Sequence, residues 1–213
     1  MIRAFLGGSF DPVHSGHVAM ARYLLQAQLA DVVHVVPAWL SPHKENTRVG
    51  VEHRLAMARL AFATIDDLII EDVEVESGRA CFTVETLSTL QKAYENASWL
   101  LVIGGDNLAT FGQWHQPAQL QALAKIVVLG RGNCDLSDQA IPSAGLAPER
   151  VVCYPDFDLP VSSTEVRALL QGGLPSAPVL AASGIPAAVA EYIIAHQLYA
   201  PNQNGENCVP DPD

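Results

Sequence analysis

Basic residues are scarce in this chain. Lysine and arginine together number 12, against 23 aspartates and glutamates, which gives a formal net charge of -11 at pH 7. A surface with such an excess of negative charge repels nucleic acid and anionic membranes at long range. We therefore expect neither as a partner, and an anionic substrate would have to be bound by a few well-placed basic or polar groups.

Cysteines and long apolar runs are also few. The four cysteines are far apart and form no CxxC pair: Cys81, Cys134, Cys153 and Cys208. A zinc site or a disulfide framework is therefore not expected, and a reducing cytoplasm is the default compartment. No apolar run approaches the roughly 20 residues that a membrane-spanning helix needs. The first apolar stretch is broken by Gly7 and Gly8, too early for a secretory signal peptide.

The pattern of apolar residues indicates an α/β fold. Hydrophobic residues make up 49% of the 213 positions, enough for one large domain with a buried core. Short β-rich runs lie at Ile2–Leu6, Val32–Val36, Leu68–Asp72, Trp99–Ile103, Ile126–Leu129 and Val151–Tyr154. Stretches with helical spacing lie at Val18–Leu29, Leu55–Phe62, Thr83–Tyr94, Gln119–Leu123 and Ala187–His196. This alternation predicts a Rossmann-like, doubly wound, mainly parallel sheet with helices on both faces and a small C-terminal helical portion.

The rest of the chain is expected to be irregular. Residues 130–149 are rich in Gly, Ser, Asp and Pro, which predicts a long surface loop. Residues 201–213 predict a flexible acidic tail, to which we assign no function. Residues 1–200 then form a single domain.

The segment GGSFDPVHSGH, residues 7–17, joins the first predicted strand to the first predicted helix. Ligands of open α/β sheets bind beyond the carboxyl ends of the strands, and a helix N-terminus offers N–H groups to an anion. His14 and His17 are three residues apart and share a helix face, and Gly16 leaves space for a bulky group. The two imidazoles either donate hydrogen bonds to phosphate oxygens or merely cap the loop. The segment is neither GxGxxG nor GxxxxGK[ST].

A second junction of this kind is predicted at SSTEVR, residues 162–167. Ser162 and Glu165 have the spacing of a capping box, so a helix begins here. A helix cap with a solvent-exposed Arg167 is one interpretation, and an anion site is the other, because a cation in the first turns opposes the helix dipole unless an anion binds there. The hydroxyls of Ser163 and Thr164, the helix N–H groups and the Arg167 guanidinium suit a triphosphate.

These two motifs resemble the nucleotidyltransferase superfamily marked by HxGH, and within it the bacterial nicotinate-nucleotide adenylyltransferases. Similar segments are PHK at residues 42–44, TxxTL from Thr83, GxD followed by a tryptophan from Gly104, and a closing helix up to Tyr199. Together they run from about Leu6 to Tyr199. The resemblance implies a nucleotidyltransferase domain over residues 1–200, which transfers AMP from ATP to nicotinate mononucleotide in NAD biosynthesis and releases pyrophosphate.

The resemblance also implies the roles of individual residues. The catalytic residues would be His14, His17 and Arg167. The ATP side would comprise Gly8, Ser9, Phe10, His14, His17, Gly104, Asp106, Ser162, Ser163, Thr164 and Arg167. The nicotinate mononucleotide side would comprise Lys44, Thr83, Trp114, His115 and Arg131. Trp114 would stack on the pyridine ring, and Thr83 with the backbone around His115 would hold the ring carboxylate. Asp106 equally suits the N-cap of a helix over residues 108–111.

Some positions and some alternatives stay open. Arg131 stands between two glycines, where the family often has a paired or proline-followed arginine, and Phe82 replaces a common hydroxylated aromatic. No carboxylate cage for a metal is evident, so we expect Mg²⁺ bound mainly through the ATP phosphates and no protein metal ligand. A related HxGH enzyme acting on nicotinamide mononucleotide or phosphopantetheine, or a non-catalytic nucleotide-binding sensor, are the alternatives. The sequence does not predict the oligomeric state.

Overall fold

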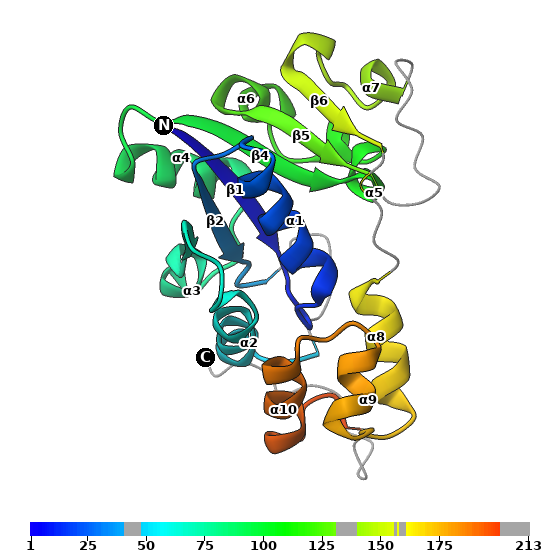
Figure 1. The fold of residues 1–213 in the computed structure, drawn as a ribbon. Coiled ribbons are helices and arrows are strands. Elements are labelled where there is room, and N and C mark those ends of the chain that lie inside the picture. The colour runs from blue at the N-terminus through cyan, green and yellow to red at the C-terminus, as the bar shows by residue number, and fades with distance from the viewer. Residues whose placement is uncertain (41–47, 131–139, 156, 158–160, 201–213) are drawn as a thin grey trace.

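The computed structural model describes residues 1–40, 48–130, 140–155, 157 and 161–200. Within them one sheet of six strands has the order β3-β2-β1-β4-β5-β6, and every neighbouring pair is parallel. The strands are β1 (Ile2–Gly8), β2 (Val32–Pro37), β3 (Leu68–Ile70), β4 (Ser98–Gly104), β5 (Lys125–Leu129) and β6 (Val151–Tyr154). The Rossmann-like sheet and its six strands are as predicted (Figure 1).

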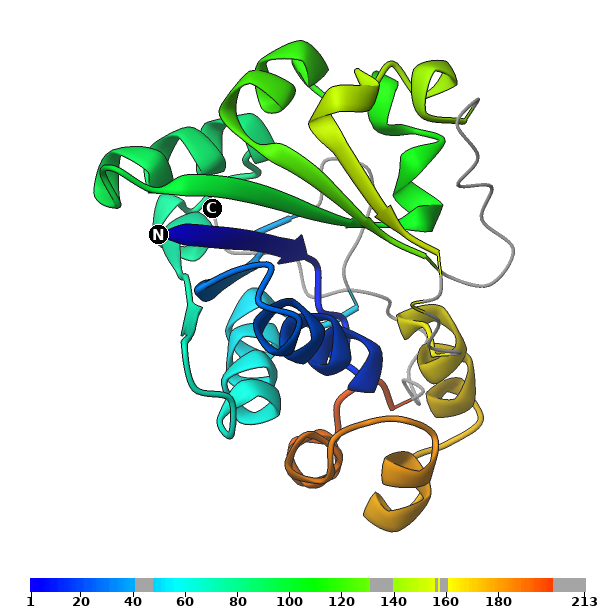
Figure 2. The same cartoon turned by 45° about the horizontal axis from the view of Figure 1, so that its top comes forward.

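Helices cover both faces of the sheet, and a separate core lies on each face. Successive side chains of a strand point alternately into the two cores. In β1, Ala4 and Leu6 enter one core, while Phe5 enters the other. Helices of the first core are α1 (Ser15–Gln26), α2 (Val51–Phe62), α8 (Ser163–Gln171), α9 (Ala177–Ala182) and α10 (Ala187–Ala195). Those of the second are α3 (Val73–Ser77), α4 (Thr83–Ala93), α5 (Gly105–Leu108), the 3-10 turn Phe111–Gln113, α6 (Pro117–Leu123) and α7 (Ala140–Ser143). Figure 2 shows the green helices on one side of the sheet and the blue, cyan and orange ones on the other.

The expectation of a surface loop over residues 130–149 is wrong for its second half. Residues 131–139 lie outside the described part, but α7 follows them and Pro148–Arg150 form a 3-10 turn. Ile141, Ala144 and Leu146 are 9%, 4% and 3% exposed and belong to the second core. The loop was predicted because turn-forming residues dominate the composition of this segment. Burial of three apolar side chains is nevertheless enough to hold the segment against the second core.

The strand order predicts a ligand site between β1 and β4, because β2 and β3 add to one side of β1, and β4, β5 and β6 to the other. β1 and β4 are neighbours, yet their following helices cover opposite faces, which opens a crevice at their carboxyl ends. In both views α8, α9 and α10 gather near the N-terminal end of α1, beyond that edge of the sheet (Figures 1 and 2). The second junction is therefore carried to the same end of the sheet as the first.

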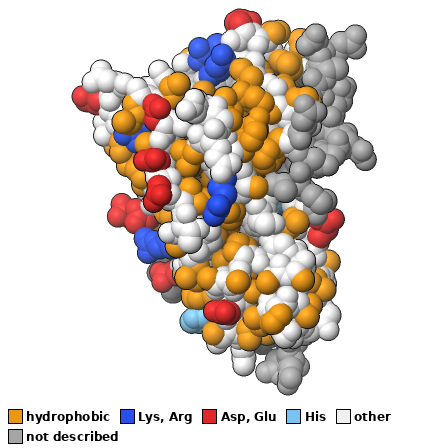
Figure 3. All heavy atoms as spheres, in the orientation of Figure 1, with side chains coloured by type: hydrophobic (Ala, Val, Ile, Leu, Met, Phe, Trp, Pro, Cys, Tyr) orange, Lys and Arg blue, Asp and Glu red, His pale blue; other side chains and the backbone are white. Residues whose placement is uncertain are grey.

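The surface reflects the acidic composition. In Figure 3, Asp and Glu side chains line one edge of the visible face, with few Lys or Arg among them. No described helix is both long enough and apolar enough to cross a membrane. The tail at 201–213 lies outside the described residues, and the single domain over 1–200 stays a prediction.

Candidate functional site

The first strand-to-helix junction ends in a buried histidine. His14 is 1% exposed and stands at the N-cap of α1 with extended backbone angles. Gly16 is required beside it, because a Cβ there would lie 2.9 Å from two atoms of the His14 ring. The same Cβ would be 3.5 Å from the Val161 carbonyl oxygen. The glycine therefore lets the start of α1 approach the segment that leads into α8.

The two imidazoles are stacked, and the orientation of the second is fixed by the backbone. The ring centroids of His14 and His17 are 3.8 Å apart with an interplanar angle of 28°. The His14 backbone N–H donates to His17 Nδ1 at 3.2 Å. Since Nδ1 accepts, the neutral ring carries its proton on Nε2, and that nitrogen is a donor. This arrangement suits a group with acceptor oxygens, such as a phosphate.

The second junction has the capping box that its spacing predicted. The Ser162 Oγ accepts from the Glu165 N–H at 3.2 Å, and the Glu165 carboxylate accepts from the Ser162 N–H at 2.9 Å. The helix that follows, α8, begins at Ser163. The N–H groups in the first turn of α8 point out of the helix end, and this end of a helix attracts anions.

The two junctions are bonded to each other. The Ser163 hydroxyl donates to the Pro12 carbonyl oxygen at 3.0 Å. The Arg167 guanidinium donates to the Asp11 carbonyl oxygen at 2.6 Å and to the Thr164 Oγ1 at 3.1 Å. Segments about 150 residues apart in the chain thus form one structure, as the proposed shared phosphate site requires.

A single pocket of about 400 Å³ runs from these junctions toward the second core. The predicted site residues that line it are Gly8, Ser9, His14, His17, Thr83, Gly104, Asp106, Trp114, His115, Ser162, Ser163 and Thr164. Phe10 and Arg167 do not line it. Lys44 and Arg131 lie outside the described residues, so their predicted contacts with the mononucleotide stay predictions.

Phe10 lies behind the pocket wall, where it packs against His17. Its side chain is 1% exposed and packs edge-on against His17, with a centroid distance of 4.9 Å, and against Phe62. Any contact of this residue with a nucleotide would come from its backbone. Arg167 similarly holds the loop through Asp11 rather than forming the pocket wall.

The structure changes the expected environment of Asp106. Its interpretation as the N-cap of a helix over residues 108–111 is wrong, because α5 spans Gly105–Leu108 with Gly104 at its N-cap. Asp106 is exposed in the first turn, and its Oδ1 accepts from the Asn107 Nδ2 at 3.2 Å. The turn begins directly at the end of β4, so Asp106 still lies at the pocket, where its carboxylate can accept from hydroxyl groups.

The far end of the pocket is aromatic. The rings of Phe82 and His115 are stacked, with centroids 4.2 Å apart and planes at 23°. Trp114 is half-buried against Phe111. Thr83 is the first residue of α4, so a helix N-terminus faces this end as well. An aromatic ring bearing a negative group fits such a wall.

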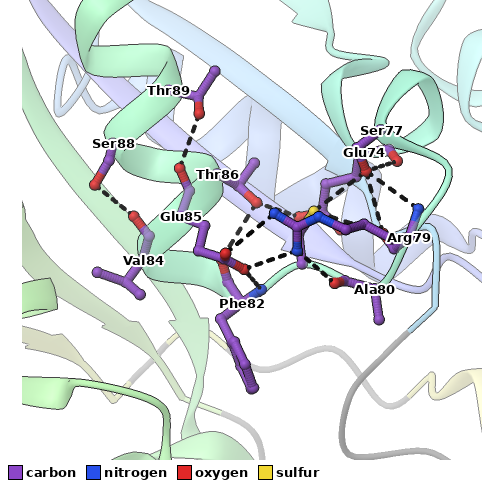
Figure 4. Close-up of polar contacts among 11 residues, drawn as sticks. Glu74, Ser77, Arg79, Ala80, Phe82, Val84, Glu85, Thr86, Ser88 and Thr89 are labelled. Carbon is purple, nitrogen blue, oxygen red and sulfur yellow. Dashed lines mark hydrogen bonds and ion pairs between the residues drawn. The ribbon is translucent and has the colours of Figure 1, made fainter.

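Contacts that α3 and the turn after it make with α4 hold this aromatic end in place (Figure 4). The Arg79 guanidinium pairs with the Glu85 carboxylate, which also accepts from the Phe82 N–H at 2.8 Å. The buried Glu74 carboxylate accepts from the Thr86 hydroxyl at 2.7 Å, and burial raises the pKa of Glu74. In Figure 4 the Phe82 ring points away from these polar contacts.

Sequence reasoning missed Arg54, which holds the loop after β1 in place. Its side chain is fully buried, and its guanidinium donates to the carbonyl oxygens of Ser9 and Ala38 at 2.7 Å each. It also donates to those of Trp39 and Val49. The only signal was its place on the apolar stripe of α2, three residues before Met57.

Known proteins that are similar to this chain indicate its family. The family described as Cytidylyltransferase-like matches residues 5–169. A protein of Herpetosiphon aurantiacus named "Probable nicotinate-nucleotide adenylyltransferase" is 34% identical over 198 residues, which are 91% of this chain and 96% of that protein. A protein of Methylibium petroleiphilum with the same name is 34% identical over 200 residues, 93% and 92% of the two chains.

A solved structure shares the fold. The Plasmodium falciparum nicotinic acid mononucleotide adenylyltransferase complexed with NaAD superposes with a TM-score of 0.76 at 18% identity, over 93% of this chain and 97% of that one. The same parasite enzyme complexed with APC gives a TM-score of 0.73. At this identity the likeness establishes the fold, and the curated relatives establish the family. This chain belongs to the Cytidylyltransferase-like family and, within it, to the nicotinate-nucleotide adenylyltransferases.

Proposed function

We propose that this chain transfers the adenylyl group of ATP to nicotinate mononucleotide, forming nicotinate adenine dinucleotide and pyrophosphate. One observation carries the proposal. A single pocket has imidazoles and helix-terminal hydroxyls at one end and Trp114 with a helix N-terminus at the other. A triphosphate fits the first end and a pyridine carboxylate the second, so the reacting phosphates would meet between them.

The chemistry needs positioning rather than a base. A phosphate oxygen of the mononucleotide attacks the α-phosphorus of ATP in line. The new P–O bond forms as the bond to the bridging oxygen breaks, and pyrophosphate leaves with the electron pair. A phosphomonoester has its second pKa near ~6, so the nucleophile is already ionised at neutral pH. Catalysis of this kind comes from orientation and from stabilising negative charge.

The phosphate end supplies donors whose directions the structure constrains. His17 Nδ1 accepts from the backbone, so Nε2 donates to the ATP phosphates and to the transition state. The Thr164 Oγ1 accepts from Arg167, which leaves its proton to be donated elsewhere. The Ser163 hydroxyl donates to Pro12, so we assign the phosphate contact of this residue to its backbone N–H. Direct contact of Arg167 with the β- and γ-phosphates remains part of the proposal.

The end of the pocket at Trp114 and Thr83 favours nicotinate mononucleotide, which carries a carboxylate, over nicotinamide mononucleotide, which carries an amide. Trp114 would stack on the pyridine ring, and the N-terminus of α4 at Thr83 would receive the ring carboxylate. Backbone N–H groups satisfy a carboxylate, whereas a carboxamide presents an NH₂ group that needs an acceptor. The nicotinate form is therefore the preferred substrate.

The described residues fit a metal that arrives with the nucleotide. No group of three His, Cys, Asp or Glu side chains comes together within residues 1–40, 48–130, 140–155 and 161–200. Mg²⁺ takes phosphate oxygens and water readily, so it needs no protein cage here. When bound, the metal would neutralise part of the phosphate charge. The exposed Asp106 carboxylate, which lines the pocket, would contact the metal through a water molecule.

The test is product formation. The protein is mixed with ATP, Mg²⁺ and nicotinate mononucleotide, and the dinucleotide is sought by chromatography and mass spectrometry. Nicotinamide mononucleotide and phosphopantetheine are run in parallel. We expect kcat/KM for the nicotinate form to exceed that for the amide by about tenfold or more, since the amide leaves polar groups unpaired. Product from another acceptor alone would reassign the substrate, and no product from any acceptor would indicate a nucleotide sensor.

Two earlier expectations remain predictions. Cys81 and Cys153 are free thiols among the described residues, in keeping with a reducing compartment, and we propose the cytoplasm. The prediction that nucleic acid is not a partner rests on the net charge of -11.

A further inference from the structure

The end of the described chain returns to the first junction. The Tyr199 hydroxyl donates to the Asp11 Oδ1 at 2.7 Å, although the two residues are 188 positions apart. Tyr199 follows α10, has a φ of 64°, and packs its ring against the first core. A tyrosine in the left-handed region is uncommon, so the surrounding contacts must hold it there.

Asp11 is the residue through which this contact reaches the pocket. It is 4% exposed, three residues before His14 and two after Ser9. Its Oδ2 accepts from the Arg48 N–H at 2.9 Å, and its carbonyl oxygen accepts from Arg167. Asp11 is thus held from three separate segments, and the Tyr199 hydroxyl is the partner of one carboxylate oxygen.

The hydroxyl stays a donor over a wide pH range. Burial raises the pKa of Tyr199 well above its usual 10, and the negative charge of Asp11 adds to the effect. The positive charges of Arg54 and Arg167 act on the pKa in the opposite direction and are the smaller effects. A hydrogen bond from a neutral donor to a buried carboxylate stabilises the protein more than an exposed hydrogen bond does. Its loss leaves a buried negative charge with too few hydrogen-bond donors.

We propose that Tyr199 is a positioning residue: its hydroxyl fixes Asp11 and thereby the loop between β1 and α1 that receives the ATP phosphates. The C-terminal segment then sets the geometry of the N-terminal phosphate site without touching the nucleotide. The inference rests on the proposed function only in its use of ATP, and not on the identity of the acceptor.

The variant that tests it is Tyr199→Phe, which removes one oxygen atom and keeps the ring. The matched control is Tyr192→Phe. The Tyr192 hydroxyl bonds to His53 Nδ1 at 2.9 Å, and neither residue lines the pocket. Both variants lose a tyrosine hydroxyl from the same C-terminal region. Folding of each is checked by circular dichroism and by the thermal midpoint, Tm.

Binding of an ATP analogue with a methylene between the α- and β-phosphates is measured by calorimetry, so that no acceptor is needed. We expect Tyr199→Phe to raise Kd roughly tenfold, in line with a displaced positioning loop, and Tyr192→Phe to leave it within about twofold. In steady state, KM for ATP should rise while KM for the mononucleotide stays unchanged. A merely destabilised protein would lower the active fraction and change neither Kd nor KM.

Equal affinity of the two variants for the analogue would overturn the proposal. If Tyr199→Phe does not fold, Asp11→Leu gives the second test, because leucine keeps the approximate shape of the side chain and removes the oxygen atoms that accept from Tyr199 and Arg48. Unchanged analogue binding by Asp11→Leu would likewise overturn the proposal. Absence of binding by the unaltered protein would instead overturn the proposed function itself, so the two failures are distinguishable.

Discussion

The Arg167 guanidinium donates a hydrogen bond of 2.6 Å to the main-chain carbonyl oxygen of Asp11, 156 residues away in the chain. This contact joins the helix N-terminus of α8 to the loop that precedes His14. A charged donor and a backbone acceptor in a half-buried setting form a strong, directional link. The two segments that we propose to bind phosphate are thereby fixed relative to each other.

Replacing His17 by alanine should reduce kcat by about 10²-fold or more, because one donor aimed at transition-state charge is lost. The fold should survive, since His17 is only half-buried and its ring faces the pocket. Pyrophosphate release is the assay. His196→Ala is the control, because that histidine is exposed beyond α10. Near-native turnover by a folded His17→Ala protein would contradict the assignment.

Arg167→Lys should raise KM for ATP by roughly tenfold, because an ammonium cannot reproduce the fork that spans the Asp11 carbonyl and the Thr164 hydroxyl. Arg59→Lys is the matched control, since Arg59 pairs with Asp72 on the surface at 3.5 Å. Steady-state kinetics with varied ATP measures the effect. Identical KM values for the two variants would show that the fork has no part in ATP binding.

Arg54→Met should lower the free energy of unfolding by about 3 kcal/mol, because several buried carbonyl oxygens lose a charged donor. Urea denaturation measures this loss. The control is Arg22→Met, because the Arg22 side chain is exposed and its guanidinium donates to the Thr64 hydroxyl at 3.2 Å. A change in stability no larger than that of the control would mean that the carbonyls find other partners.

Trp114→Ala should raise KM for the mononucleotide by about tenfold while KM for ATP changes little, since the lost stacking surface lies at the acceptor end. The two KM values are measured in the same assay. A rise confined to KM for ATP would place the adenosine, and not the pyridine, against this tryptophan.

Acid should weaken the fold through Glu71. Hydrogen bonds from His34 and Tyr94 hold the pKa of Glu71 below its ordinary value of 4.5. The stabilisation is therefore present above pH 4.5 and is lost as the pH falls through the lowered pKa. Glu71→Gln should be less stable than the unaltered protein near neutral pH, and the difference should shrink as the pH falls through the lowered pKa of Glu71. Chemical denaturation at several pH values measures this difference, and a constant difference would contradict the prediction.

Local sequence predicted the sheet and both junctions because their determinants are local. Strands of a buried parallel sheet are continuous apolar runs, and the capping box of Ser162 and Glu165 needs only a spacing of three. Arg54 was missed because its partners include carbonyl oxygens of two distant segments, at Ser9 and at Ala38 and Trp39, which no pattern within α2 specifies. The helix at 140–143 was missed for a similar reason, since its burial depends on contact with the distant second core.

Shared recognition of one triphosphate by both junctions is tested most directly by a crystal structure of this chain with Mg²⁺ and the methylene analogue of ATP. We expect the His17 Nε2 and the Thr164 Oγ1 to lie within about 3.2 Å of oxygen atoms of the same triphosphate, the usual limit for such hydrogen bonds. A triphosphate held by one of the two helix N-termini alone, with the other more than a water molecule away, would contradict that expectation.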